Sequence, residues 1–487
     1  MSLAQLIARS GISFGTSGAR GLVVDFTAEV CAAFSQSFLR VLAQQVASNE
    51  ATGKTTVDLT QVAIGIDHRP SSMAMAQACA GAAKALGVIP RFFGVLPTPA
   101  LAHYALRHKI PAIMVTGSHI PFDRNGLKFY RPDGEISKAD EQQILACAAP
   151  LQPFTAMELV ADPVAAALYL RRYQQFFAAD ALAGLHIGVY EHSSAGRDLY
   201  RSVFEALGAT VTTLQRSDVF VPIDTEAVSA EDQAKARAWA AQYGFDAIFS
   251  TDGDGDRPLL SDEDGNWLRG DIVGLLAAKH LGIQALAVPV SCNSAIEQSQ
   301  LFRNVERTRI GSPYVIEAFA RLAARFDTVA GFEANGGFLL ASSLKNTHGE
   351  LTELPTRDAL LPALAVLAAS KGRGVAALLH DLPARFTASD RLPHVPTAWS
   401  QAWLQQFMAA PAAWLQPFGW CEADVGDVNQ LDGLRLTLSC GDVVHLRPSG
   451  NAPELRCYVE AATVEAAQAL LVKVLRVVQA LVQRTLQ

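Results

Sequence analysis

The chain has 487 residues, of which half are hydrophobic and 18% are charged, and its formal net charge is −7. A chain of this length is too long to fold around a single hydrophobic core. A size of about 100–200 residues per domain predicts three or four domains. The acidic balance and the lack of a basic block argue against nucleic acid as the main partner.

The cysteines and apolar runs favour a cytoplasmic protein without a membrane partner. Seven cysteines are scattered and form no CxxC pair, which disfavours a disulfide framework or a zinc knuckle. The longest apolar run, at residues 360–369, is far shorter than the ~18 residues that a membrane span needs. Arg9 interrupts the short N-terminal apolar stretch, so we expect no signal peptide.

Along the chain, short strand-like runs alternate with helical stretches, which is typical of α/β domains. Thr27 is expected to cap a first helix. The strands expected in the first two units lie at residues 62–67, 92–95, 112–115, 186–190 and 247–250. The first of these units is expected to end near residue 155.

A third unit is predicted to begin with a hairpin at residues 258–268, where Asp264-Gly265 suits a tight turn. Its later strands are expected at residues 285–290 and 328–330. Residues 370–374, SKGRG, predict a linker or a helix end. Beyond them we expect strands at 434–438, 443–446 and 454–460, and then a long helix capped by Thr463.

The most specific motif is TDGDGDR, residues 251–257, where Asp252, Asp254 and Asp256 alternate with glycine. Flexible glycines let carboxylates at this spacing converge on one point, and hard oxygen ligands suit Mg²⁺. An EF-hand is an alternative, with Glu263 at its twelfth position, but Arg257 stands where that loop needs glycine. A solvated acidic turn is the other alternative.

A second motif, residues 115–130, reads VTGSHIPFDRNGLKFY. Gly117 is expected to let the backbone turn sharply and to present the hydroxyl of Ser118, beside which His119 can donate to a phosphate. Asn125-Gly126 is a tight-turn signal that would bring Lys128 back toward the serine as an acid/base candidate. The alternative is a surface loop with an ordinary serine.

Three further loops carry polar groups suited to phosphate and sugar. Residues 447–456, RPSGNAPELR, predict an anion nest formed by Arg447, Ser449, Gly450 and Asn451. In GFEANGGF, residues 331–338, Glu333 and Asn335 could bind neighbouring sugar hydroxyls, and in FGTSGARG, residues 14–21, Ser17 and Arg20 could contact phosphate. Each loop, taken alone, also fits an ordinary polar turn. Taken together, the five motifs are the parts that phosphoryl transfer to and from a sugar requires.

These motifs resemble the α-D-phosphohexomutase superfamily, the phosphomannomutases and phosphoglucomutases, over nearly the full length and in the family's order. TGSHIP is similar to the family's Thr-Ala-Ser-His-Asn-Pro loop, and DGDGDR matches its magnesium loop. GFEANGG resembles the sugar-binding loop, and RPSGNAPELR resembles the phosphate-binding loop; IGIDHRPSS and GVLPTPA are also similar. Departures include Ile120 for the usual Asn, Asn335 for Ser, Asn451-Ala452 for Thr-Glu, and Gly337 where many members have His.

The resemblance implies three related mixed α/β domains and a smaller C-terminal α+β domain around a central cleft, with boundaries at 1–155, 156–258, 259–372 and 373–487. It implies Ser118 as phosphoryl carrier and Mg²⁺ ligand beside Asp252, Asp254 and Asp256, and Lys128 as acid/base. It implies the remaining roles by position: Arg20, His119 and Arg257 support the transferred phosphoryl, Glu333 and Asn335 select the sugar, and Arg309, Arg447, Ser449, Gly450 and Asn451 bind the substrate.

The expected reaction is the interconversion of mannose 6-phosphate and mannose 1-phosphate, with hexose 1,6-bisphosphate as intermediate and activator. Phosphoglucomutase and phosphoglucosamine mutase are the alternatives within the class. A non-catalytic relative that binds sugar phosphates is the alternative from another class. The group that replaces the histidine absent at Gly337 stays open at this point.

Overall fold

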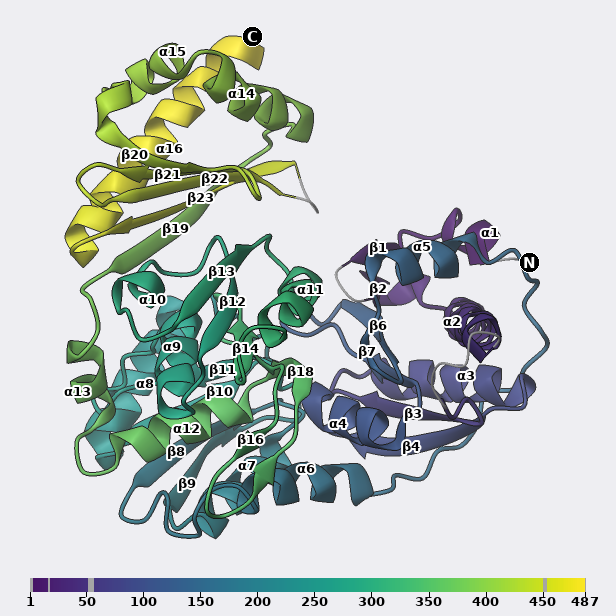
Figure 1. Ribbon diagram of the computed structural model, residues 1–487. Helices are drawn as coiled ribbons and strands as arrows, with labels where there is room; N and C mark the ends of the chain where they lie inside the picture. The colour runs from purple at the N-terminus through teal and green to yellow at the C-terminus, as the bar shows by residue number, and fades with distance from the viewer. Residues whose placement is uncertain (1–2, 16–17, 51–56, 450–452, 487) are drawn as a thin grey trace. The chain divides into compact units, whose positions relative to one another are not determined.

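The computed structural model describes residues 3–15, 18–50, 57–449 and 453–486 (Figure 1). The chain divides into two compact units, each with its own hydrophobic core. Unit 1 comprises Met1–Gln284 and Phe319–Leu378, and unit 2 comprises Ala285–Ala318 and Leu379–Gln487.

Unit 1 opens with a sheet of seven strands in the order β1-β2-β6-β5-β3-β4, with β7 paired to β6. The strands are β1 Ser13–Gly15, β2 Gly18–Leu22, β3 Gln61–Ile66, β4 Ile89–Val95, β5 Ala112–Val115, β6 Arg124–Arg131 and β7 Gly134–Glu135. β3 runs parallel to β4 and β5, whereas β6 runs antiparallel to β5 and β2. Residues 62–66 of β3 are all buried, as expected of a parallel strand inside an α/β layer.

The helices of this part are α1 Leu3–Ile7, α2 Ala28–Glu50, α3 Ser72–Ala85, α4 Thr98–His108 and α5 Lys138–Ala146. Val30 donates its backbone N–H to Oγ1 of Thr27 at 3.3 Å, which confirms the predicted cap of α2. Phe38 of α2 packs on Phe129 of β6 with ring centroids 4.9 Å apart. The helix is thereby fixed on the sheet that carries the serine loop.

A second sheet of unit 1 has the order β11-β10-β8-β9. Its strands are β8 His186–His192, β9 Thr210–Arg216, β10 Ala247–Thr251 and β11 Pro258–Leu260, and helices α6 Val164–Gln174, α7 Arg197–Ala206 and α8 Ala230–Tyr243 accompany them. β8 is parallel to β9 and β10, and β11 is antiparallel to β10. The bridge between Ser261 and Trp267 confirms the predicted hairpin, and Gly265 adopts a φ of +77° at its turn.

The rest of unit 1 is an antiparallel path and its helices. β14 Val329–Phe332 pairs with β15 Phe338–Leu340, which pairs with β18 Leu354–Asp358, while β16 Leu344–Lys345 and β17 Glu350–Leu351 form a separate hairpin. The helices are α9 Gly270–His280, α12 Leu360–Ser370 and α13 Val375–His380. α12 ends at Ser370, so SKGRG marks a helix end.

Unit 2 contains the parallel pair β12 Ala285–Pro289 and β13 Asn304–Thr308, with α10 Ala295–Gln298 and the start of α11 Ser312–Ala323. Its larger sheet is antiparallel, in the order β19-β23-β22-β21-β20. The strands are β19 Phe386–Pro393, β20 Val425–Asn429, β21 Leu434–Leu438, β22 Val443–Pro448 and β23 Glu454–Ala461. Helices α14 Thr397–Ala409, α15 Pro411–Leu415 and α16 Val464–Leu486 complete it, and Thr463 caps α16 as predicted. Short 3₁₀ segments lie at Val23–Asp25, Gln416–Phe418 and Glu422–Asp424.

One prediction from the sequence, a tight turn at Asn125-Gly126, is wrong. Asn125 and Gly126 lie inside strand β6, paired with β2, instead of forming a tight turn. The side chain of Asn125 is fully buried and donates to the hydroxyls of Ser71 and Ser72, so tertiary partners replace the local turn contacts that asparagine usually makes.

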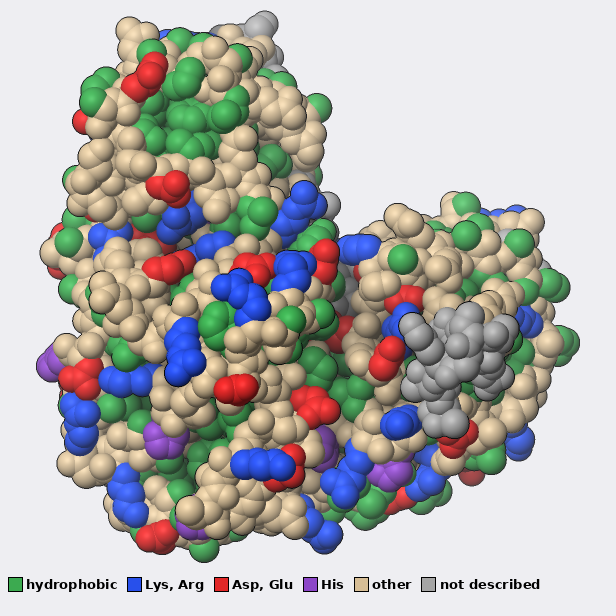
Figure 2. Space-filling model, viewed as in Figure 1, with side chains coloured by type: hydrophobic (Ala, Val, Ile, Leu, Met, Phe, Trp, Pro, Cys, Tyr) green, Lys and Arg blue, Asp and Glu red, His purple; other side chains and the backbone are tan. Residues whose placement is uncertain are grey.

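The surface gives two general observations. Side chains of both charge signs are interspersed on the face seen in Figure 2. Within the described part of the chain, no helix combines the length and the apolar character that a membrane span requires.

Candidate active site

Ser118 lies in the loop that joins β5 to β6, and its side chain is fully buried. Its φ of +55° falls in the left-handed region that residues other than glycine rarely adopt. The hydroxyl donates to Oδ2 of Asp252 at 2.6 Å, and the backbone N–H donates to Oγ1 of Thr116 at 2.8 Å. The loop therefore presents the serine to the predicted metal loop.

Arg69 holds the serine loop, and its role was not predicted from the sequence. Its guanidinium donates to the carbonyl oxygens of Ser118 at 2.9 Å and Ile120 at 2.5 Å, and to two further carbonyls of the loop. A Cβ on Gly117 would lie 2.6 Å from Cζ of Arg69, so this glycine makes room for the guanidinium. The residue with the left-handed conformation in this loop is Ser118, not Gly117. The sequence did contain a feature that could have pointed to Arg69, because this residue belongs to the family-like segment IGIDHRPSS.

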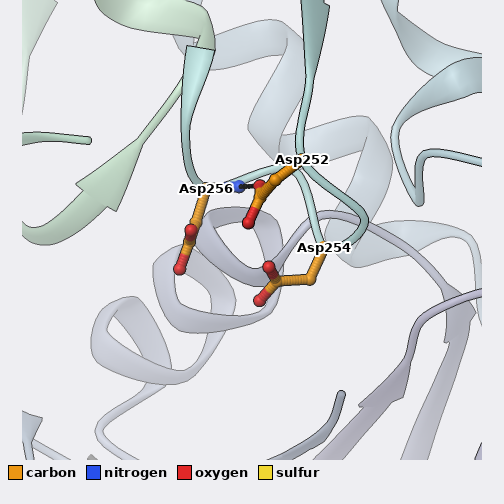
Figure 3. Close-up of side chains that lie close together, drawn as sticks. All are labelled: Asp252, Asp254 and Asp256. Atoms are coloured by element: carbon orange, nitrogen blue, oxygen red, sulfur yellow. Dashed lines mark hydrogen bonds between the residues drawn. The ribbon is translucent and has the colours of Figure 1, made fainter. Parts of the chain in front are cut away.

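Asp252, Asp254 and Asp256 lie in the loop between β10 and β11, and all three are buried. One carboxylate oxygen of each lies within 4.8 Å of the others, and Figure 3 shows the three side chains turned toward a common space. The backbone N–H of Asp256 donates to Oδ1 of Asp252 at 3.2 Å, which closes the loop. A Cβ on Gly253 would lie 2.7 Å from the carbonyl oxygen of Ser118, so glycine permits this close approach of the two loops.

This carboxylate group fits a hard divalent cation. Oδ1 of Asp254 and Oδ1 of Asp256 are buried and lack a hydrogen-bond partner among the described residues. A buried carboxylate oxygen without a donor is costly unless a cation satisfies it. The three aspartates could therefore hold a metal ion.

Both alternatives for the metal loop are wrong. The flanking elements are strands, and Glu263, the twelfth ligand of an EF-hand, instead accepts the backbone N–H of Ala376 at 3.0 Å. The loop is not a solvated turn either, because the three aspartates are at most 1% exposed.

Lys128 reaches the same carboxylates from β6. Its Nζ lies 2.5 Å from Oδ2 of Asp254 and 2.8 Å from Oδ2 of Asp256. Thr98, at the start of α4, also donates to Oδ2 of Asp254, at 2.6 Å, and this contact was not predicted. The ammonium group thus lies where the serine loop and the metal loop meet.

The three aspartates differ in acidity. Burial and the neighbouring carboxylates raise the pKa of Asp252 well above its usual value. Burial opposes ionisation of Asp254 and Asp256 too, but Lys128 beside Asp254, and Arg357 with Lys128 beside Asp256, lower the pKa of both groups. Ionisation is therefore favoured at Asp254 and Asp256 and opposed at Asp252.

His119 lies beside Ser118, and two arginines, Arg257 and Arg20, lie close enough to affect its pKa. Nη1 of Arg257 donates to Nδ1 of His119 at 2.9 Å, and that nitrogen lies 3.5 Å from Oγ of Ser118. Burial and Arg257 lower the pKa of His119 to about 3, so its imidazole is neutral at pH 7. Burial, Arg257 and Arg357 lower the pKa of Arg20 to about 10, and such crowding of guanidinium groups favours an anionic ligand.

Glu333 and Asn335 lie between β14 and β15, and both are buried. Oε2 of Glu333 accepts from Nη1 of Arg357 at 3.2 Å, and Nε of Arg357 donates to Oδ2 of Asp256 at 3.1 Å. Oδ1 of Asn335 accepts the backbone N–H of Gly337 at 3.0 Å, which stabilises the loop itself. Arg357 joins the sugar loop to the metal loop and is a further residue that sequence reasoning missed.

Carboxylates and cations are interleaved at this site in unit 1. The carboxylates Asp252, Asp254, Asp256 and Glu333 lie among the cations Arg20, Lys128, Arg257 and Arg357. Cations placed in this way suit phosphoryl transfer, in which charge on the moving group must be offset.

Arg309 and Arg447 lie in unit 2 and contact neighbouring residues, Leu431 and Asp432. Nε of Arg447 donates to Oδ1 of Asp432 at 2.9 Å, and the backbone N–H of Ile310 donates to Oδ2 at 3.0 Å. Arg309 is exposed and donates to the carbonyl oxygen of the residue before Asp432. Within unit 2 the structure thus brings these two arginines to the same turn.

Ser449 is buried at the end of β22, where its backbone N–H donates to the carbonyl oxygen of Glu454 at 2.9 Å. Gly450 and Asn451, which complete the predicted anion nest, lie outside the described residues, as does Ser17. Apart from Arg309, Arg447 and Ser449, the predicted site residues that the structure describes all lie in unit 1.

Three sequence profiles of one family match the chain. They are described as Phosphoglucomutase/phosphomannomutase, and they match residues 11–152 as alpha/beta/alpha domain I, residues 269–386 as alpha/beta/alpha domain III and residues 396–477 as the C-terminal domain. Together with the observed sheets, these matches confirm three α/β/α domains followed by an antiparallel C-terminal domain.

Curated relatives match nearly the whole chain. A phosphomannomutase of Salmonella muenchen is 54% identical over 456 residues, covering 94% of this chain and 93% of that protein. A phosphomannomutase of Sinorhizobium fredii (strain NBRC 101917 / NGR234) is 43% identical over 480 residues, covering 96% and 98%.

A solved structure shows the same fold. A phosphoglucomutase/phosphomannomutase family protein from Burkholderia thailandensis superposes with a TM-score of 0.75 at 19% identity, covering 99% of this chain and 98% of that chain. This likeness concerns the fold alone, whereas the sequence matches to the two curated relatives cover 94% and 96% of this chain. The chain belongs to the phosphoglucomutase/phosphomannomutase family of the α-D-phosphohexomutase superfamily.

Proposed function

We propose that this protein is a phosphomannomutase, an isomerase that interconverts mannose 6-phosphate and mannose 1-phosphate by intramolecular phosphoryl transfer. The observation that carries the proposal is the 54% identity, over 94% of the chain, to the Salmonella muenchen phosphomannomutase. The contact of Ser118 with the buried aspartates and their neighbouring cations supports the same reaction class.

Ser118 is the phosphoryl carrier in this proposal. The phosphoserine gives its phosphoryl group to the free hydroxyl of the hexose phosphate, and the serine oxygen is left as a hydroxyl. The bisphosphorylated sugar then returns its other phosphoryl group to the serine, so each turnover ends with the carrier restored. Hexose 1,6-bisphosphate is therefore both the intermediate and the activator that phosphorylates an unmodified chain.

Ser118, Asp252, Asp254 and Asp256 are the residues that would hold Mg²⁺. The close approach of the three carboxylates, and the lack of a hydrogen-bond donor to Oδ1 of Asp254 and of Asp256 among the described residues, support this set. When bound, the ion supplies charge neutralisation to the phosphoryl group and favours the in-line arrangement of donor and acceptor.

The remaining chemistry belongs to the cations around the serine. Lys128 is held by Asp254 and Asp256 within reach of the serine loop, where it can give or take the proton of the reacting sugar hydroxyl. Arg20, His119 and Arg257 bind the oxygens of the transferred phosphoryl group. Neutral His119 does so as a hydrogen-bond donor from its second ring nitrogen.

Two sets of residues are proposed to recognise the substrate. Glu333 and Asn335 select the sugar hydroxyls in unit 1. The phosphate that is not transferred is bound by residues from the last part of the chain and one from residues 285–318: Arg309, Arg447, Ser449, Gly450 and Asn451. The shared turn at Asp432 supports a joint role for the two arginines.

We also propose the four-domain division at residues 1–155, 156–258, 259–372 and 373–487. It assigns one loop to each domain: phosphoserine, metal, sugar and phosphate.

We also propose a cytoplasmic location, from the composition and the seven free cysteines.

A coupled assay with mannose 1-phosphate, glucose 1-phosphate and glucosamine 1-phosphate tests the function. Purified protein is primed with hexose 1,6-bisphosphate and Mg²⁺, and formation of each 6-phosphate is followed. We expect the highest kcat/KM for mannose 1-phosphate. A higher value for glucose or glucosamine 1-phosphate would reassign the enzyme within its class. Lack of turnover with all three, despite measurable binding, would support a non-catalytic relative.

A further inference from the structure

Arg357 connects two loops that are far apart in the sequence. It lies in β18, is 4% exposed, and donates from Nε to Oδ2 of Asp256 at 3.1 Å and from Nη1 to Oε2 of Glu333 at 3.2 Å. One planar guanidinium therefore sets the distance between a proposed metal ligand and the proposed sugar ligand. Its planar fork also fixes the directions of the two contacts, which the freely rotating donors of an ammonium group would not.

Gly337 provides the space that Arg357 needs. A Cβ at position 337 would lie 2.6 Å from Cδ, 2.6 Å from Cγ and 2.9 Å from Cβ of Arg357. Contacts this short do not occur in folded proteins, so no side chain at 337 is compatible with the present position of Arg357. The same glycine stands where the resemblance leads one to expect a histidine, and the stem of Arg357 fills that volume.

The guanidinium is a permanent cation. Although burial opposes ionisation, Asp256 and Glu333 raise the pKa of Arg357 well above its usual value. Arginine does not release its proton in proteins, so Arg357 cannot serve as the proton carrier in place of a histidine. What remains for it is to orient and to neutralise the two carboxylates that it contacts.

We propose that Arg357 is a positioning residue of the active site, which aims Glu333 at the sugar by binding one of its oxygens and fixes that loop to Asp256, and that Gly337 is required to accommodate it. Because the pair engages Oε2 of Glu333, Oε1 is the oxygen that faces the sugar hydroxyl. This inference deepens the proposed function and rests on it.

The alternative is that Arg357 only stabilises the fold. Removing one member of a buried ion pair is destabilising in any protein, so a fall in thermal stability does not distinguish the two roles. If Arg357 acts through Glu333, the kinetics can show it. Once Glu333 has lost its charge, replacing Arg357 as well should lower kcat/KM only slightly further. A purely structural role predicts that the two losses multiply.

The experiment measures kcat and KM for mannose 1-phosphate in Arg357→Met, Arg357→Lys, Glu333→Gln and the double variant Glu333→Gln/Arg357→Met. A misplacement of about 1 Å at a reacting group can cost about 10²-fold, so Arg357→Met should lower kcat/KM by about 30-fold or more. Arg357→Lys should recover part of this loss because it keeps the charge without the fork. The double variant should lie within about threefold of the worse single variant, rather than at the product of both losses.

Gly337→Ala gives a second test that leaves both charged groups in place. Its Cβ must displace the Arg357 stem, so kcat/KM should fall in the same direction as in Arg357→Met. Arg172→Met is the matched control, because Arg172 is equally buried in unit 1 and donates to Thr352 outside the site. The control removes a buried guanidinium outside the site and should keep the wild-type kcat and KM.

Two results would overturn the role of Arg357: kcat/KM of Arg357→Met within about twofold of the wild type, or losses that multiply in the double variant. Should Arg357→Met fail to fold, Arg357→Lys and Gly337→Ala decide the matter, and wild-type kinetics in both would overturn it. An inactive wild type would instead overturn the proposed function, so the two failures are separable in one assay.

Discussion

The Nζ atom of Lys128 lies 2.5 Å from Oδ2 of Asp254, although 126 residues separate them in the chain. The contact joins the serine-bearing sheet to the metal loop, because Lys128 belongs to β6 and Asp254 follows β10. The lysine is 3% exposed, so its charge is compensated almost entirely by protein carboxylates.

Lys128→Met should lower kcat by about 10²–10⁴-fold, the usual contribution of general acid–base catalysis. The measurement is steady-state turnover of mannose 1-phosphate at saturating Mg²⁺. Lys138→Met is the control, since that lysine pairs with Glu141 on the half-exposed surface of α5 and should leave kcat unchanged. A loss of less than a few-fold in Lys128→Met would move the proton carrier to another group.

Ser118→Ala should fold yet lose nearly all mutase activity, because it removes the carrier oxygen and one hydrogen bond to Asp252. Intact mass before and after phosphatase treatment, paired with activity, measures the carrier directly. Ser137→Ala, which removes the cap of α5, should cost about 1 kcal/mol of stability without loss of activity. Full activity in a preparation without the phosphoryl mass would contradict the mechanism.

Arg69→Met should unfold more easily than any surface variant, because Asp67 and the serine-loop carbonyls would lose a buried partner. The expected cost is about 3–5 kcal/mol, the range for breaking a buried pair. Arg91→Met is the control, since its pair with Asp162 is more than one-third exposed and should contribute at most about 1 kcal/mol. Denaturant titration compares the two, and equal midpoints would contradict the role of Arg69.

Arg447→Lys should raise KM for mannose 1-phosphate because lysine keeps the charge but loses the bidentate fork that suits phosphate. Arg456→Lys is a close control: Arg456 lies opposite Arg447 in the β22–β23 register and pairs with Glu454. KM should change in the first variant alone. Equal KM values in both variants would remove Arg447 from the phosphate site.

Stability should fall below pH 6.5 because buried histidines are neutral in the fold. Burial and Arg172 lower the pKa of His103 to about 3, and burial lowers that of His192 to about 4. In the unfolded chain each histidine binds a proton near pH 6.5. The free energy of unfolding therefore falls by up to about 1.4 kcal/mol per pH unit for each histidine as the pH decreases from 6.5 toward 4. Thermal unfolding between pH 7 and 5 measures this slope, and His103→Gln should flatten it. An unchanged slope would contradict the assignment.

Local spacing was enough to predict the metal loop and most strands. Alternating Asp and Gly bring three carboxylates together within five residues, and no distant partner is needed to do so. The caps at Thr27 and Thr463 were predictable for the same reason, since a cap contacts its own helix. Asn125-Gly126 was mispredicted because hydroxyls more than fifty residues away satisfy the asparagine inside a strand.

The sequence by itself determined the fold class and the reaction class, and it predicted the phosphoserine and the metal ligands, because short motifs of fixed spacing carry all four. Only the tertiary structure decided the parts made by distant contacts. Arg69 supports Ser118 from 49 residues away, and Arg357 reaches Asp256 across 101 residues. Neither has a local pattern that marks it, since an arginine in a loop or strand acquires its role from the carboxylates and carbonyls that folding places around it.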